Sequence, residues 1–122
     1  MNLKESLEFN NFLVIGNTTN EEKYAYKIKS SLLRAGKNVV SIKEDYMHID
    51  DIKEDIDVLD LCINPNSGLR YLEETNRTFK FVIIQPGAES IEIKNYLEKR
   101  NIEYVEGCLL LALKIHKGIE VM

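Results

Sequence analysis

The chain has 122 residues, 44% of them apolar and 30% charged, and its formal net charge is −4. This length and composition are typical of one globular domain, residues 1–122. The negative charge argues against a nucleic-acid surface, which needs clustered Lys and Arg. No segment has the roughly 20 apolar residues that cross a bilayer, and the N-terminus lacks the apolar core of a secretion signal. We therefore expect a cytoplasmic protein with neither a nucleic-acid nor a membrane partner.

Five short apolar runs alternate with longer amphipathic stretches from one end of the chain to the other. The runs cover residues 12–16, 38–42, 57–63, 81–84 and 103–106. This alternation is the pattern of parallel strands that are joined by helices. It predicts an α/β fold, a three-layer sandwich whose central sheet has five parallel strands.

The segments between these runs are predicted to contain helices. The first crossover has apolar residues at helical spacing: Tyr24, Ile28, Leu32 and Ala35. Thr19 and Glu22 have the spacing of a capping box, so this helix should begin near Asn20, and Gly36 stands where it should stop. Shorter helical segments are expected within residues 3–8, 49–54, 67–75, 89–101 and 108–118.

The order of the strands follows from the right-handed connections between parallel strands. We predict the order 3-2-1-4-5, in which the direction of winding reverses between the first and fourth strands. A reversal opens a crevice outside the carboxyl ends of the two strands concerned. Residues 16–20 and 85–89 should then face each other across this crevice.

The loop after the first strand has the composition of a phosphate site. Gly16 has no Cβ, so a ligand can approach the backbone, and the first N–H groups of the following helix attract anions. The polar residues placed to meet a ligand there are Asn17, Thr18, Thr19, Lys23 and Tyr26. An ordinary strand-to-helix corner would use many of the same residues, so the loop alone does not decide the function.

A second uncommon turn, formed by Gln85, Pro86, Gly87 and Ala88, follows the most apolar strand. Pro86 forces Gln85 into an extended conformation, and Gly87 is expected at a backbone angle that other residues resist. The N–H groups after Pro86 would then be available to a neutral part of a ligand, because Glu89 repels phosphate. Asn64–Pro65 forms a similar uncharged turn on the same rim. The alternative is a plain loop with stiff corners.

Two acidic residues, Glu44 and Asp45, follow the second strand, where a carboxylate can hold the ribose of an adenosine. Acid at this place favours a free hydroxyl over a phosphate, as in an NAD-like nucleotide. The G-x-G-x-x-G fingerprint is absent, however, since only Gly16 of its three glycines is present. A solvated acidic loop that continues to Asp55 is the alternative interpretation.

No catalytic or metal-binding arrangement can be assembled from the sequence. His48 and His116 have no partner at a useful spacing, and Cys62 and Cys108 form neither a CxxC pair nor a metal cluster. Cys108 fits either a reactive thiol on the ligand side or a small buried apolar residue. We expect no metal and no enzymatic activity.

Four stretches together resemble the small stand-alone CoA-binding proteins, whose Rossmann-like domain is similar to that of succinyl-CoA synthetase α subunits. They are FLVIGNTTNEEKYAYKIKSSLLRAG, DVLDLCINPN, FVIIQPGAES and IEYVEGCLLL, in unbroken order from Phe12 to Leu110. The Gln-Pro-Gly-Ala block is the most specific of these matches. Cys108 stands where the family has a cysteine after the fifth strand.

The resemblance implies a Rossmann-like domain that binds coenzyme A or an acyl-CoA without catalysis. It places the diphosphate on the first loop and the pantetheine past Asn64–Pro65 and the turn at Gln85–Ala88, with Cys108 at that end. Gly16→Val should then abolish CoA binding and leave the fold largely intact. The sequence departs from the family after the second strand, where Glu44 and Asp45 disfavour the 3′-phosphate of CoA unless Lys43 compensates.

Two other functions stay open at this point. An NAD-like nucleotide-dependent enzyme or enzyme subunit is supported by Glu44 and Asp45. A degenerate domain that serves as an interaction module, for instance in a homo-oligomer, is supported by the apolar segment Leu109–Ile115.

Overall fold

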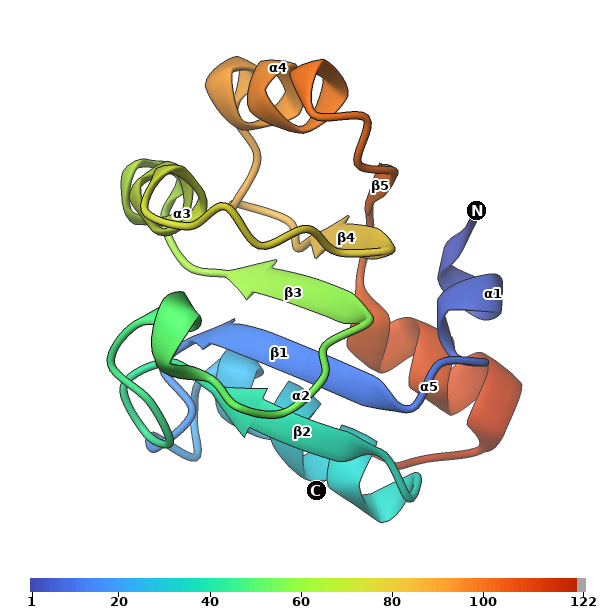
Figure 1. Cartoon of the computed structure of the whole chain (residues 1–122). Coiled ribbons are helices and arrows are strands. Elements are labelled where there is room, and N and C mark those ends of the chain that lie inside the picture. Colours follow the sequence, from blue (N-terminus) through green and yellow to red (C-terminus); the bar gives the residue numbers. More distant parts are fainter. Residues whose placement is uncertain (121–122) are drawn as a thin grey trace.

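The computed structural model of the protein describes residues 1–120, and residues 121–122 lie outside this description. One parallel sheet is covered by helices on both faces (Figure 1). Its strands are β1 (Asn11–Gly16), β2 (Asn38–Ser41), β3 (Val58–Cys62), β4 (Phe81–Ile84) and β5 (Tyr104–Glu106). The helical elements are α1 (Leu3–Ser6), α2 (Tyr24–Arg34), η1 (Ile49–Asp51, a 3-10 turn), α3 (Pro65–Glu73), α4 (Ile91–Lys99) and α5 (Leu109–Lys117). The predicted Rossmann-like α/β sandwich with five parallel strands is confirmed.

The order of the strands is β2-β1-β3-β4-β5, so the predicted order 3-2-1-4-5 is wrong. β3 lies between β1 and β4, with Phe12 opposite Val58 on one side and Val58 opposite Phe81 on the other. Both orders can be built with right-handed connections, and the handedness rule therefore cannot choose between them.

Burial explains why β3 is central and β2 lies at the edge. Val58, Leu59 and Leu61 are fully buried although neighbouring residues of a strand point to opposite faces of the sheet. A strand that is apolar on both faces is most stable inside a sheet, between two other strands. β2 is exposed at Asn38 and only half-buried at Val39, which suits an edge position.

The helices divide between the two faces of the sheet (Figure 1). α3 and α4 cover the face that carries Leu59 and Leu61, whereas α1, α2 and α5 cover the face that carries Val58 and Phe81. Two apolar cores result, one on each side of the sheet. No helix within residues 1–120 is long and apolar enough to cross a membrane.

α2 begins at Tyr24, later than the predicted start near Asn20, and the predicted capping box does not form. Asn17 Oδ1 instead accepts hydrogen bonds from the N–H groups of Thr19 (3.2 Å) and Asn20 (3.1 Å). Asn20 Oδ1 accepts the N–H of Glu22 at 3.0 Å. Local bonds of this kind compete with the helix and keep the segment in turns.

The buried face of α2 also differs from the prediction. Tyr24 is 67% exposed and lies outside the core. The buried residues are Ala25, Ile28, Ser31 and Leu32. Gly36 follows the helix with a positive φ of 81°, as expected for a residue that ends it.

Candidate ligand-binding site

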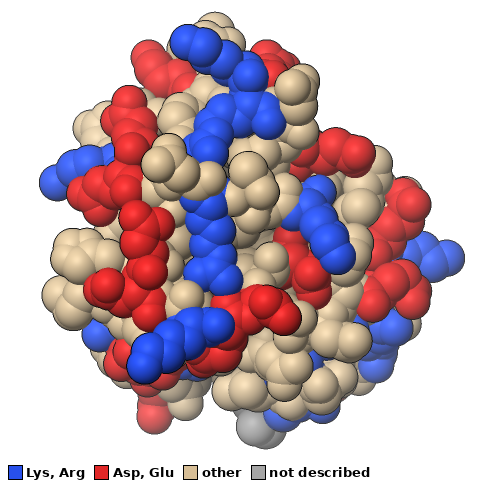
Figure 2. All heavy atoms as spheres, viewed as in Figure 1, with Lys and Arg blue, Asp and Glu red and all other residues tan. Residues whose placement is uncertain are grey.

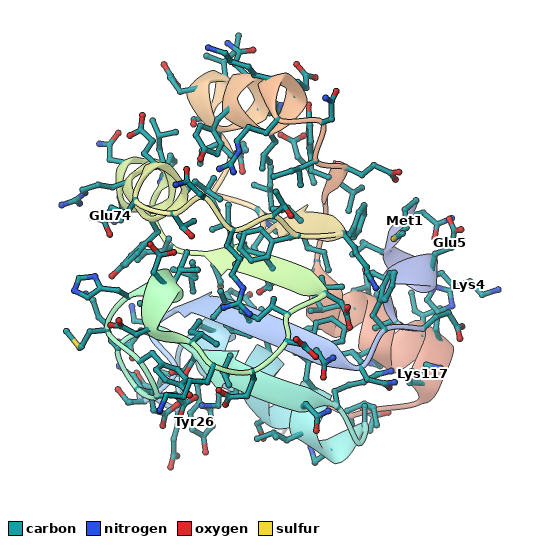
Figure 3. The ribbon with its side chains drawn as sticks, in the orientation of Figure 1. Met1, Lys4, Glu5, Tyr26, Glu74 and Lys117 are labelled. Carbon is teal, nitrogen blue, oxygen red and sulfur yellow. The ribbon has the colours of Figure 1, made fainter. Side chains whose placement is uncertain are left out.

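A cleft with a volume of about 390 Å³ lies at the carboxyl ends of β1, β2 and β3. It is lined by Ile15, Gly16, Asn17, Thr18, Thr19, Ile42, Lys43, Glu44, Ile63 and Tyr71. A smaller cavity of about 220 Å³ shares Lys43, Ile63 and Tyr71 with it and extends toward Arg70. In Figure 3, Tyr26 and Glu74 mark this side of the molecule, and the opposite side carries Met1, Lys4, Glu5 and Lys117.

The cleft coincides with the point where the sheet reverses its direction of winding. The chain leaves β1 toward β2 on one side, and from β3 it continues to β4 and β5 on the other. Ligands of open α/β sheets bind at such a point, outside the carboxyl ends of the strands. The reversal lies between β1 and β3, not between β1 and β4 as predicted, and Gly16 therefore lies opposite Cys62.

Gly16 is required for packing. A Cβ on Gly16 would lie 2.4 Å from the backbone oxygen of Cys62 and 2.7 Å from Cβ of Ala25. Both distances are far below van der Waals contact, and the atom at Cys62 belongs to the central strand. The expectation that Gly16→Val leaves the fold largely intact is therefore wrong.

The loop after Gly16 is held in shape by two polar residues. Asn17 Oδ1 binds the backbone of Thr19 and Asn20, as described above, and it also accepts a hydrogen bond from Thr19 Oγ1 at 3.2 Å. Thr18 is buried, and its Oγ1 donates to Ser41 Oγ at 3.2 Å. These bonds fix the loop on the cleft and tie it to the end of β2.

The two carboxylates after β2 are paired with a lysine of α2. Lys29 Nζ lies 2.8 Å from Glu44 Oε1 and 2.7 Å from Asp45 Oδ2. Lys29 Nζ also donates to Ser41 Oγ at 3.0 Å, and Asp45 Oδ2 accepts the N–H of Ser41 at 2.9 Å. We call Lys29, Ser41, Glu44 and Asp45 the rim cluster. Asp45 is thereby turned toward β2 and α2 and does not line the cleft.

Ionisation in the rim cluster follows from these contacts. The hydrogen bond from Lys29, followed by one from Thr18, lowers the pKa of Glu44. For Asp45, burial opposes ionisation, but the bonds from Lys29 and Ser41 outweigh it and lower the pKa. For Lys29, burial likewise opposes the charge, and the two carboxylates still raise its pKa. All three groups are therefore charged at neutral pH.

Four residues that line the cleft were not named from the sequence as ligand contacts: Ile15, Ile42, Ile63 and Tyr71. Lys43, which the sequence offered only as compensation for Glu44 and Asp45, lines the cleft as well. Lys43 has a positive φ of 80°, which places its side chain on the cleft at a backbone angle that favours glycine. Ile63 follows β3 and Tyr71 belongs to α3, so both reach the cleft only because β3 lies beside β1. The apolar character of residues 57–63 is the feature of the sequence that indicates this central position of β3.

The turn at Gln85–Ala88 has the predicted backbone but faces another environment. Gly87 has a φ of 92°, and its N–H donates to Glu89 Oε2 at 2.7 Å. The N–H of Ala88 donates to the oxygen of Gln85 at 2.9 Å. Two of the three N–H groups that were expected to meet a ligand, those of Gly87 and Ala88, therefore have partners within the turn. Neither Gln85 nor Pro86 lines the cleft.

Gln85 instead reaches a buried carboxyl group in the centre of the sheet. Its Nε2 donates to Asp60 Oδ1 at 2.5 Å, and Asp60 is fully buried. Asp60 Oδ2 has no hydrogen-bond partner within residues 1–120. Burial raises the pKa of Asp60 to about 7, although the bond from Gln85 acts in the opposite direction.

The remaining predicted site residues are dispersed. Lys23 is the N-cap residue of α2 and lies outside the cleft. Tyr26 lines an adjoining cavity of about 400 Å³ along α2, which shares Thr18 and Glu44 with the cleft. Asn64 caps α3, with its Oδ1 accepting the N–H of Ser67 at 2.9 Å, and Pro65 is the first residue of that helix. Their role in ligand binding stays a prediction.

The cysteines are free thiols on the side of the sheet opposite the cleft-lining α3. Cys108 is the N-cap residue of α5 and packs against the core beneath α2 and α5. Burial raises the pKa of Cys62 to about 12, so this thiol is protonated and unreactive at neutral pH. Within residues 1–120, no three His, Cys, Asp or Glu side chains are grouped as metal ligands would be.

Charges of both signs are interspersed over the face of the molecule that Figure 2 shows. Lys and Arg side chains form a column down the upper middle of this view, and Asp and Glu side chains lie on both sides of it. Recognition of a charged ligand therefore depends on individual groups at the cleft, such as Lys43 and Glu44.

Comparison with known proteins assigns residues 10–114 to the family described as the CoA binding domain. A conserved hypothetical protein from Pyrococcus furiosus is 29% identical, with a TM-score of 0.75 over 87% of this chain and 99% of that chain. A hypothetical protein from Pyrococcus horikoshii OT3 is 22% identical, with a TM-score of 0.85 over 95% of this chain and 90% of that chain. A protein from Thermus thermophilus is 19% identical, with a TM-score of 0.78 over 95% and 99% of the two chains.

The last two structures, below 25% identity, are similar to this chain in fold alone. A search of curated proteins gives no match. The family match, in contrast, extends from before β1 into α5 and covers most of the chain, as the resemblance in the sequence implied. The chain therefore belongs to the family of CoA binding domains.

Proposed function

We propose that this protein binds coenzyme A or an acyl-CoA in the cleft at the carboxyl ends of β1 and β3, and that it does so without catalysing a reaction. One observation carries the proposal: the cleft lies at the reversal of the sheet and is bounded by the loop Gly16–Thr19. Residues 20–23 lie between this loop and α2, whose N-cap residue Lys23 makes no side-chain capping bond. In this proposal a phosphate on the loop extends toward the first N–H groups of α2.

The shape of the cleft supports an extended ligand. The cleft and the smaller cavity meet at Tyr71, which lines both. A nucleotide longer than one cavity can continue into the other along Ile63 and Tyr71, with the aromatic ring offering a surface for a base or a pantetheine chain. Lys43 lines both cavities as well and supplies a positive charge for the ligand phosphates.

The side chains of the cleft support binding without catalysis. Its acidic residue, Glu44, is engaged by Lys29 and has a lowered pKa, so it is a weak base at neutral pH. His48 lines only the smaller cavity, where its Nδ1 lies 3.9 Å from Glu74 Oε2 at the surface. A cytoplasmic location is part of the proposal and is supported by two thiols that are both free.

A calorimetric titration of the ligand-stripped protein with CoA, dephospho-CoA and NAD tests this function. Saturable binding of CoA is expected. Lys43→Gly is the variant of choice, because glycine accepts the positive φ of this residue and the fold should be retained. We expect Lys43→Gly to weaken CoA about tenfold through the loss of a phosphate contact. Lys53→Gly removes the same charge from a residue outside both cavities and should leave the affinity unchanged.

The outcomes separate the candidate functions. A stronger response to NAD than to CoA would replace the CoA proposal with the NAD-like enzyme. Binding of none of the three ligands would reject the cleft as a nucleotide site. Equal losses in Lys43→Gly and Lys53→Gly would move the site away from this cleft.

An interaction module is the second candidate, and one observation favours it. Leu111 and Ile115 are 56% and 64% exposed and lie one turn apart on α5. Apolar residues exposed together in this way are found at subunit contacts. The measurement is the mass in solution as a function of concentration: a mass that rises with concentration, and falls in Ile115→Lys, would support a homo-oligomer through α5.

A further inference from the structure

The cleft has an unusual charge arrangement for a site that receives a phosphorylated nucleotide. Glu44 lines the cleft directly, and Asp45 follows it in the same loop. The side chains of Glu44 and Asp45 are 36% and 37% exposed, so water screens their charges only in part. Two unpaired carboxylates here would repel a phosphate on the ligand.

Lys29 removes this repulsion. Its ammonium group donates to three acceptors, Ser41 Oγ at 3.0 Å, Glu44 Oε1 at 2.8 Å and Asp45 Oδ2 at 2.7 Å, which match its three N–H donors. The Lys29 side chain is only 14% exposed, and its cation is thus held in place beside the carboxylates. Lys29 and Lys43 together balance the charges of Glu44 and Asp45.

The cluster is also connected to the phosphate-binding loop. Thr18 is buried between the cleft and the cavity over α2, and it lines both. Its hydroxyl donates to Ser41 Oγ, the same oxygen that Lys29 binds. Lys29 is therefore placed to fix the charge of the rim and the position of the loop with a single side chain, although it contacts the cleft only through these neighbours.

We propose that Lys29 is a positioning residue that sets the charge preference of the cleft, so that the protein accepts a nucleotide with a phosphate on its ribose. This inference rests on the proposed function and adds to it the group that decides between CoA and dephospho-CoA, which differ only in the ribose 3′-phosphate. When Lys29 is absent, the loop after β2 carries two carboxylates and one lysine. The cleft then favours the ligand without the ribose phosphate.

The test measures the dissociation constants of CoA and dephospho-CoA for the wild type and for Lys29→Met. We expect Lys29→Met to weaken CoA about tenfold and dephospho-CoA less than about threefold, because only CoA carries the additional dianion. The difference between the two ligands should shrink in about 0.5 M salt, where the Debye length falls below 5 Å. Lys29→Arg, which keeps the charge, should restore most of the CoA affinity.

Two further variants separate charge from structure. Glu44→Gln with Asp45→Asn, added to Lys29→Met, removes the unpaired carboxylates and should return the preference for CoA. Lys27→Met is the matched control, since Lys27 lies on the same helix next to the Tyr24 ring. Lys27 lines neither the cleft nor the cavity along α2. This variant should leave both affinities unchanged.

The outcomes distinguish this inference from the function on which it rests. If the wild type binds neither ligand, the proposed function and the inference both fail. If the wild type binds CoA and Lys29→Met weakens the two ligands equally, only the inference fails, because Lys29 then has a purely structural role. Should Lys29→Met not fold, Glu44→Gln with Asp45→Asn in the presence of Lys29 gives the decision: a stronger preference for CoA supports the inference, and an unchanged ratio overturns it.

Discussion

The loop at Gly16–Thr19 and the turn at Gln85–Ala88 each follow a buried parallel strand, and each contains one glycine. Gly16 has no room for a Cβ, because that atom would lie 2.4 Å from the backbone oxygen of Cys62 in the central strand. A Cβ added to Gly87 would have no atom within 4 Å, and glycine is favoured there only because the backbone has a φ of 92°. The first loop opens on the cleft, and the second folds back on itself and sends Gln85 to a buried carboxyl group. The two stretches have similar composition, but their glycines are needed for different physical reasons and their surroundings differ.

The largest effect in this comparison is expected at Gly16. Gly16→Val places three carbon atoms where the backbone oxygen of Cys62 and the Cβ of Ala25 already lie. Since neither β3 nor α2 can move without breaking the core, we expect a loss of about 5 kcal/mol in the free energy of unfolding. Urea unfolding, followed by circular dichroism, measures this loss. A folded Gly16→Val that lacks only CoA binding would contradict the packing argument.

Asp60, beneath the second turn, should make stability depend on pH. The pKa of this group is raised to about 7 in the folded protein, against an ordinary value near 4, so the folded state retains a proton that the unfolded state releases. Stability is then highest below about pH 4 with respect to this group, falls as the pH rises to about 7, and is constant above it. The fall amounts to at most about 4 kcal/mol.

The variant that checks this dependence is Asp60→Asn, which keeps the shape of the side chain and removes its titration. We expect the wild type to lose stability between pH 5 and pH 7 in urea unfolding and Asp60→Asn to lose much less. The rim cluster titrates in another range: its lowered pKa values stabilise the fold above about pH 4, and this contribution is lost only on further acidification. Equal slopes for wild type and variant would mean that Asp60 keeps an ordinary pKa.

Gln85→Leu should have a smaller effect of the same sign. It removes the donor to Asp60 Oδ1 and leaves both oxygens of that carboxyl group without a partner. We expect a loss of about 2 kcal/mol at pH 7 and a smaller loss at pH 5, where Asp60 is protonated. A double-mutant cycle with Asp60→Asn isolates the coupling of the pair. A loss that does not change with pH would show that Gln85 acts through packing alone.

The sequence predicts the strands well, and most closely where the apolar runs are fully buried. The runs at 12–16 and 81–84 match β1 and β4 within one residue. Strand order is harder, because handedness permits both candidate orders and the choice depends on which strand is buried on both faces. Residues 57–63 are more apolar than residues 38–42, and this difference indicates that β3 is central and β2 is at the edge.

The candidate site is predictable only in part for the same reason. Gly16–Thr19 is found because a ligand loop follows the first strand whatever the strand order. Ile63 and Tyr71 are missed because they reach the cleft only when β3 lies beside β1. The pairing of Lys29 with Glu44 and Asp45 joins residues 15 and 16 positions apart, and no local pattern marks it. The sequence therefore indicates where the acidic residues lie along the chain but not that their charges are balanced.

The smallest effect is expected at Gly87, and it bears most directly on the second turn. Gly87→Ala meets no neighbouring atom, so its cost is limited to the strain of a positive φ, about 1 kcal/mol. The turn does not line the cleft, and the affinity for CoA should therefore stay within about twofold of the wild type. Gly36→Ala is the matched control, because Gly36 has a similar φ of 81° and an equally open surrounding at the far end of α2. Equal destabilisation and unchanged affinity in both variants would restrict the ligand to the first loop. A loss of CoA affinity in Gly87→Ala alone would show that the Gln-Pro-Gly-Ala turn contacts the ligand after all, and that a bound CoA extends past β3 to β4.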